Sequence, residues 1–187
     1  MKVAGPRVPA ALVRRGWSRR IVRRFPPNVY LRRLVRTALA LGIAFEPSPV
    51  PEQWMYHPGR RAILVWEPDL RRQSLSYLVV IMAHELGHAL DFDRRPRAAP
   101  GPGRGAPPGE DLETEQQACV LGFLLLKQLH VPVSLSQYLQ MLEPPLAARV
   151  QRALAGRLCC LLDRWGPAFA AAAAAPEAFP DALPPVA

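Results

Sequence analysis

The sequence predicts an α+β fold that is mostly helical, with one small sheet. The chain has 187 residues, which is enough for one domain with its own core. Several segments show the spacing of apolar residues that is typical of helices, whereas only residues 62–66 have the branched and aromatic composition of a strand. The 22 prolines cluster, so we expect irregular segments around a compact centre.

Residues 1–27 are predicted to form a basic N-terminal arm. Eleven of the 24 basic residues fall between Lys2 and Arg36, and the first acidic residue is Glu46. The net charge of +9 therefore belongs to this part of the chain. Apolar residues recur at every fourth position among the arginines of the arm. They are Val13, Trp17, Ile21 and Phe25. This spacing predicts a short basic amphipathic helix.

Three interpretations of the arm stay open. Clustered arginines bind phosphate groups without sequence preference, which suits nucleic acid. A basic amphipathic helix with Trp17 and Phe25 on its apolar face equally suits an anionic membrane surface. Arginine outnumbers lysine 22 to 2, so the arm is also explained as a helix that packs on the domain of an arginine-rich protein.

The segment 28–166 is predicted to form the compact domain. Asn28 can cap a helix over about 29–41, and Gly42 stands where a C-terminal cap belongs. The strand at 62–66 follows, and no other segment is as strand-like, so the sheet is expected to be small.

Two long helices are predicted in the second half of this domain. The first covers about 74–91, and its middle is apolar all round, which predicts a buried central helix. A flexible loop rich in Pro, Gly and Arg over 94–109 leads to the second helix at about 111–129. A last helix is predicted over 144–165, and residues 167–187 form an Ala/Pro-rich tail.

The residues from His84 to His88 form an H-E-x-x-H motif on the predicted central helix. Positions i and i+4 share one helix face, so both imidazoles can reach one metal ion at roughly 2.0–2.1 Å. Glu85 is rotated off this pair and can accept a proton from a water that zinc has made acidic. With four His and nine Glu in the chain, a chance match is expected only about 0.004 times. The alternative is a helix that carries these residues without a metal.

A catalytic zinc site needs a third protein ligand and an open fourth position. One known continuation of the motif requires Gly at position 91 and His at position 94, but the chain has Asp91 and Arg94. A second continuation takes a carboxylate from a following helix. The helix at 111–129 begins with several acidic residues and is therefore the expected source.

Glu115 is the favoured third ligand. The small residues Ala118, Cys119 and Gly122 follow it at helical spacing, so they would let this face approach the His84 helix closely. Glu113 stays the alternative, about 160° away around the same helix.

Three further side chains are weaker candidates. Tyr56 and His57 could lie near the cleft as oxyanion stabilisers, although residues of an exposed turn are the favoured interpretation. Asp91 either orients His88 through a hydrogen bond or is a plain polar residue at the helix end.

The order of these segments resembles that of a known family. The blocks that carry the resemblance are residues 39–43, 81–91 and 113–118, with the short strand between the first two. Over roughly residues 29–130 the chain resembles the ImmA/IrrE-type zinc metallopeptidases, which are gluzincins. Their third-ligand helix usually carries Glu-Ala-Asn-x-Phe-Ala, where this chain has Glu-Gln-Gln-Ala-Cys-Val from Glu115.

The resemblance implies a compact zincin-like domain whose small sheet packs on the H-E-x-x-H helix. It implies that His84, His88 and Glu115 hold Zn²⁺ and that Glu85 is the catalytic base. It also implies a metallopeptidase that hydrolyses peptide bonds in a regulatory protein such as a transcriptional repressor. We expect the strand at 62–66 to be a sheet edge that pairs with the substrate peptide. The alternative function is a nucleic-acid-associated regulator that retains a zinc site without protease turnover.

The cysteines and the apolar runs predict a cytoplasmic protein. The three cysteines are an odd number with two adjacent, which is a poor disulfide framework and suits a reducing compartment. Arginines interrupt the N-terminal apolar residues, so no signal peptide is expected. The longest apolar runs are too short to span a bilayer, so we expect no transmembrane segment.

Overall fold

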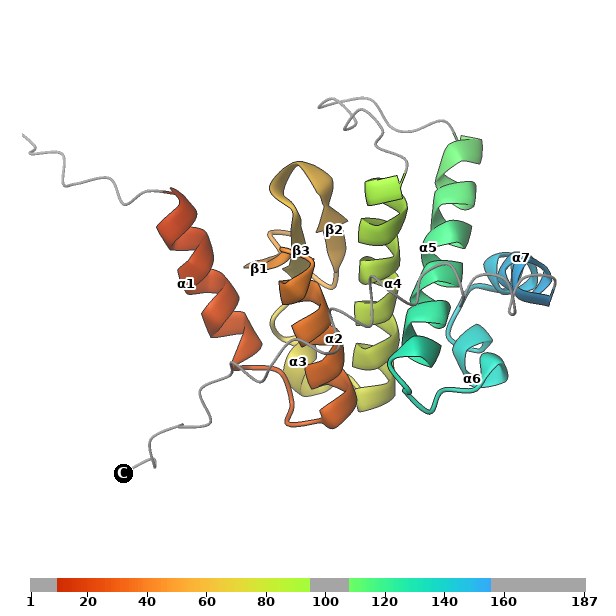
Figure 1. Cartoon of the computed structure of the whole chain (residues 1–187), viewed down its shortest axis with the longest axis horizontal. Coiled ribbons are helices and arrows are strands. Elements are labelled where there is room, and N and C mark those ends of the chain that lie inside the picture. The colour runs from red at the N-terminus through yellow and green to blue at the C-terminus, as the bar shows by residue number, and fades with distance from the viewer. Residues whose placement is uncertain (1–9, 95–107, 156–187) are drawn as a thin grey trace, which may run out of the picture.

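The structure is a computed structural model that describes residues 10–94 and 108–155 (Figure 1). It confirms the predicted α+β architecture, which is mostly helical with a small three-stranded sheet. The helices are α1 (Ala10–Val22), α2 (Val29–Ala40), α3 (Asp69–Arg72), α4 (Leu75–Arg94), α5 (Pro108–Gln128), α6 (Leu135–Leu139) and α7 (Pro144–Ala155), with a 3-10 turn at Pro58–Arg60. The strands are β1 (Ala44–Pro47), β2 (Met55–His57) and β3 (Ala62–Val65).

The sheet has the order β1-β3-β2, so the one strand that the sequence predicts lies in its centre. β1 runs parallel to β3 and β2 runs antiparallel to it. All four residues of β3 are buried. The expectation that residues 62–66 form a sheet edge is therefore wrong, because both sides of β3 are already paired. The two outer strands have only four and three residues. Runs of that length are too short to show an alternating pattern, so the sequence did not reveal them.

Helix α4 is the centre of the fold, as the sequence predicts. It lies between α5 on one side and α2 with β2 on the other (Figure 1). Leu78, Met82, Ala83 and Leu86 along it are fully buried. The predicted loop over 94–109 begins and ends slightly differently, since Arg94 belongs to α4 and Pro108 begins α5. The rest of that loop lies outside the described residues.

Two glycines let α4 and α5 touch through their backbones. A Cβ atom added to Gly87 would lie 2.7 Å from the carbonyl carbon of Ala118 and still closer to its oxygen. A Cβ atom added to Gly122 would lie 2.6 Å from the carbonyl oxygen of Ala83. Real Cβ contacts are not this short, and backbone atoms cannot move aside as the end of a flexible side chain can. Glycine at these two positions therefore fixes how closely the helices approach.

Helix α1 packs against β1 and covers that edge of the sheet (Figure 1). Ile21 is fully buried, and the Ser18 hydroxyl oxygen accepts the outward N–H of Phe45 at 3.2 Å. Arg20 and Arg24 both form ion pairs with Glu67. The described part of the basic segment is thus a packed helix, in line with the third interpretation of the arm.

The helix ends follow the local sequence signals. The Asn28 side chain accepts the N–H groups of Tyr30 and Leu31, so it caps α2. Gly42 follows α2 with a positive φ of 72°, which explains the glycine there. The expected last helix is seen as α7 up to Ala155, and its predicted continuation to 165 lies outside the described residues, as does the tail at 167–187. Among the described helices, none is long and apolar enough to cross a bilayer.

Candidate metal centre

Three side chains from two helices converge on one point. The Nε2 atoms of His84 and His88 on α4 lie 3.1 Å apart. One carboxylate oxygen of Glu115 on α5 lies 3.2 Å from His84 Nε2, and the other lies 3.3 Å from His88 Nε2. Within the described residues, these three form the group whose ligand atoms could hold a metal ion. The structure therefore brings together all three residues that the sequence analysis named as ligands.

The donor set fits a zinc ion. Two imidazole nitrogens and one carboxylate are a typical protein ligand set for catalytic zinc, which keeps its fourth position open. Ligands at roughly 2.0–2.1 Å from a tetrahedral ion lie about 3.3 Å from one another. The two Nε2 atoms lie 3.1 Å apart, close to this spacing. Each of them faces a different oxygen of the Glu115 carboxylate, at 3.2 and 3.3 Å. The Glu115 side chain is 42% exposed, so one side of the cluster opens to solvent.

Helix geometry explains why Glu115 and not Glu113 reaches the histidines. Glu115 lies one turn before Cys119 and two turns before Gly122, on the face of α5 that contacts α4. Glu113 is exposed and lies outside the converging group. The structure thus places the favoured candidate in the cluster, and it places the alternative on the solvent side.

The charges of the cluster stabilise one another. Burial alone would raise the pKa of Glu115, but hydrogen bonds from both imidazoles outweigh it and hold the pKa far below its ordinary range. Burial alone would lower the pKa of His88, but the hydrogen bond to Glu115 and the charges of Glu85, Glu115 and Asp91 raise it instead. A carboxylate that stays ionised is suited to a cation, and the raised pKa of His88 means that a proton competes for the same place.

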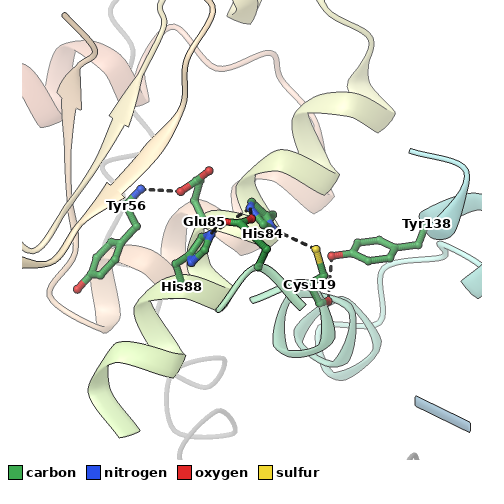
Figure 2. Close-up of polar contacts among 7 residues, drawn as sticks. Tyr56, His84, Glu85, His88, Cys119 and Tyr138 are labelled. Carbon is green, nitrogen blue, oxygen red and sulfur yellow. Dashed lines mark hydrogen bonds and ion pairs between the residues drawn. The ribbon is translucent and has the colours of Figure 1, made fainter. Parts of the chain in front are cut away.

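Glu85 lies next to the cluster on the side of the sheet (Figure 2). Its side chain is 3% exposed, and one carboxylate oxygen accepts the backbone N–H of Tyr56 at 2.5 Å. Because this N–H belongs to the edge strand β2, Glu85 joins the sheet edge to helix α4. Burial raises the pKa of Glu85, and the neighbouring histidines partly oppose that shift.

Cys119 and Tyr138 were not predicted as parts of the site. The Sγ atom of Cys119 lies 3.4 Å from Nδ1 of His84, on the far side of that ring from the ligand atom (Figure 2). Tyr138 is fully buried, and its hydroxyl donates to the Cys119 carbonyl at 3.0 Å. Burial raises the pKa of the Cys119 thiol to about 12. The spacing of Cys119 four residues after Glu115 is the available signal, but in the sequence this spacing indicates only close helix packing.

The three weaker candidates lie on strand β2 and helix α4. His57 ends β2 and is half-buried, and its Nδ1 accepts the N–H of Arg60 at 3.3 Å, so it caps the turn that follows. The favoured interpretation of Tyr56 as a residue of an exposed turn is wrong, because Tyr56 is a buried residue of β2. Tyr56 contributes its backbone N–H to Glu85, while its ring is buried in the core. Asp91 is buried on α4, and its charge helps to raise the pKa of His88.

In the comparisons with known proteins, no protein-family model, no curated protein and no solved structure matches the chain.

Proposed function

We propose that this protein is a zinc-dependent metallopeptidase of the gluzincin type. The observation that carries the proposal is the convergence of His84, His88 and Glu115 within hydrogen-bond distance of one another, with the buried carboxylate of Glu85 beside them. An H-E-x-x-H helix with a carboxylate from a following helix supplies the three ligands and the base that peptide hydrolysis requires.

The residues have distinct roles in the proposed reaction. His84, His88 and Glu115 would hold the ion and would leave the exposed side of the cluster open for water and substrate. A zinc ion held there would supply Lewis-acid chemistry, which would polarise the scissile carbonyl and make the attacking water more acidic. Glu85 takes the proton of that water and passes it to the departing amine nitrogen, so peptide-bond cleavage produces a carboxylic acid and an amine.

The position of Glu85 also favours one direction of approach for the substrate. Its carboxylate accepts an N–H from β2, which is the sheet edge beside the ligand helix. β1, the opposite edge, is covered by α1. A peptide that enters the site therefore meets β2, in place of the strand at 62–66 that the sequence analysis expected.

The proposed substrate class comes from the resemblance to ImmA/IrrE-type peptidases. Residues 29–130, which carry that resemblance, include all four proposed functional residues. On this basis we propose that the protein cleaves regulatory proteins such as transcriptional repressors. The odd number of cysteines, two of them adjacent, leads us to propose that it works in the cytoplasm.

The first experiment is elemental analysis of the purified protein and of single variants, prepared without chelators. We expect one zinc per chain in the wild type. We expect loss of the zinc in His88→Ala and Glu115→Ala, because a site with two protein ligands binds zinc weakly. Glu113→Ala is the matched control on α5, and it should retain the metal because Glu113 lies outside the cluster.

Two outcomes would contradict the proposal. A wild-type protein that contains no zinc has no metallopeptidase centre. Zinc that stays bound in both His88→Ala and Glu115→Ala lies elsewhere in the chain.

A further inference from the structure

The imidazole of His84 has a contact on each of its two nitrogens. Nε2 faces the cluster, 3.1 Å from His88 Nε2 and 3.2 Å from the Glu115 carboxylate. Nδ1 faces the other way, toward the Cys119 sulfur at 3.4 Å. The ring therefore lies between the other two residues of the cluster and the Cys119 thiol (Figure 2).

The two nitrogens of a neutral imidazole differ, because one carries the proton and the other carries the lone pair. A metal ligand must present its lone pair, so Nε2 of His84 must be unprotonated when the ion is bound. The ring proton then sits on Nδ1, and its acceptor is the sulfur of Cys119. In most metal sites this outer partner is a carboxylate, a backbone carbonyl or a water, and it sets both the tautomer and the ring orientation.

The sulfur is held firmly in place. Cys119 is fully buried on α5, one turn after Glu115, and its carbonyl accepts the hydroxyl of Tyr138. The Tyr138 ring packs on Phe123 with centroids 5.3 Å apart. The backbone contact of α5 with α4 at Gly122 fixes the separation of the thiol from the His84 ring. A short, buried side chain on a fixed backbone has little freedom to move away from the ring.

We propose that Cys119 is a positioning residue of the metal centre: its sulfur accepts the Nδ1–H of His84 and so directs Nε2 of that ring at the ion. This inference rests on the zinc site of the proposed function. It makes the thiol a partner of a ligand and not a ligand itself, in agreement with the absence of Cys119 from the converging group in the described residues.

The test compares zinc affinity in four proteins by competition with a chromophoric chelator. Cys119→Ala removes the acceptor, and we expect about 10-fold weaker zinc binding, at the low end for loss of an outer-shell partner. Cys119→Ser restores an acceptor and should recover most of the affinity. Val120→Ala is the packing control, because Val120 is buried on the same turn of α5 about 100° away. It should bind zinc as the wild type does.

Two spectroscopic readouts separate positioning from simple packing. In the zinc-loaded wild type, the His84 Nδ1–H should give a proton–nitrogen NMR signal that exchanges slowly with water. Exchange should become faster in Cys119→Ala and slow again in Cys119→Ser. In the cobalt-substituted protein, Cys119→Ser should leave the near-ultraviolet region unchanged, since the sulfur does not bind the ion.

The outcomes also distinguish this inference from the proposed function. Zinc affinity and Nδ1–H exchange that are unchanged in Cys119→Ala overturn the inference and leave the metallopeptidase proposal intact. A thiolate-to-cobalt band that Cys119→Ser abolishes makes Cys119 a ligand, which also overturns the inference. A wild type without zinc overturns both. If Cys119→Ala fails to fold, the Nδ1–H exchange rate of the wild type and the zinc affinity of Cys119→Ser test the inference instead.

Discussion

Glu85 is the side chain that connects the sheet with the proposed chemistry. It is one residue beyond His84, so its side chain is rotated about 100° from that ring toward β2. There it accepts the Tyr56 N–H and stays almost completely buried. A charged carboxylate in such a position is costly unless it is hydrogen-bonded. The strand therefore stabilises the proposed base, and the base in turn holds the strand.

The variant Glu85→Gln separates these two roles. The amide oxygen of glutamine can still accept the Tyr56 N–H, so the fold and the zinc content should stay as in the wild type. Glutamine cannot take a proton from the attacking water, so peptide hydrolysis should fall about 10²- to 10⁴-fold. The measurement is cleavage of unfolded casein followed by mass spectrometry, together with zinc analysis of the same samples. Retention of full activity would remove Glu85 from the role of base.

The helix pair α4–α5 sets the geometry of the centre, because it carries all three proposed ligands. Gly87 and Gly122 allow its backbone-to-backbone contact. Any side chain at these positions would push the helices apart and would move Glu115 away from the histidines. Within H-E-x-x-H, the glycine at position 87 is thus explained by packing and not by chemistry.

Alanine should destabilise the protein at these two positions, although a helix interior usually prefers alanine to glycine. Alanine normally stabilises a helix interior by about 1 kcal/mol relative to glycine. Here overpacking should lower the free energy of unfolding by about 2 kcal/mol in Gly87→Ala and in Gly122→Ala, and zinc binding should weaken. The measurement is urea unfolding of the metal-free proteins. Gly16→Ala in α1 is the control, since a Cβ atom there meets nothing within 4 Å, and it should not destabilise the protein.

Helix α1 links the basic segment to the core. Ile21 is fully buried, and Phe25 beyond the helix packs edge-on against Phe45 and Trp54, with ring centroids 5.7 and 6.1 Å apart. Two of the arginines are paired with Glu67. These contacts make the helix part of the packed structure, although Arg19 and Arg23 remain on the exposed side.

The variant Ile21→Ala tests this role of α1. Loss of a fully buried isoleucine should cost about 2–4 kcal/mol of unfolding free energy. The double variant Arg19→Ala/Arg23→Ala is the control: it removes two positive charges from the exposed side and should change the free energy of unfolding by less than about 0.5 kcal/mol. Equal stability of Ile21→Ala and the wild type would show that α1 does not contribute to the core. Binding of the double variant to DNA at two salt concentrations then tests the nucleic-acid interpretation separately.

At the scale of the whole molecule, the metal and the fold are expected to be coupled. The proposed ligands come from two helices that meet in the centre of the domain, so an ion that binds them stabilises the folded state over the unfolded chain. Protons compete for the same site. The raised pKa of His88 gives the metal-free protein a stabilising contribution below about pH 6.5, and that contribution is lost as the pH rises through the raised value.

Removal of the metal should therefore lower the Tm most at alkaline pH. At a free zinc concentration about 100 times the dissociation constant, zinc adds about 2.7 kcal/mol, which corresponds to a rise in Tm of about 5–10 °C. The difference in Tm between zinc-loaded and chelator-treated protein should be larger at about pH 8 than at about pH 5.5, because imidazoles must be neutral to bind. Thermal unfolding followed by circular dichroism measures it. A difference that shrinks toward pH 8 would contradict a site built on histidines.

Local features of the sequence determined much of this protein. The central helix, its H-E-x-x-H face and the cap at Asn28 depend on contacts within a few residues, so the spacing alone predicted them. Glu115 was predictable because the small residues that follow it mark the packed face of α5. The sequence could not reveal that β3 is the central strand, since pairing depends on short strands that are distant along the chain. Only the tertiary structure placed Cys119 behind His84 and brought Glu85 to the backbone of β2, because these contacts join separate elements whose approach is set by packing.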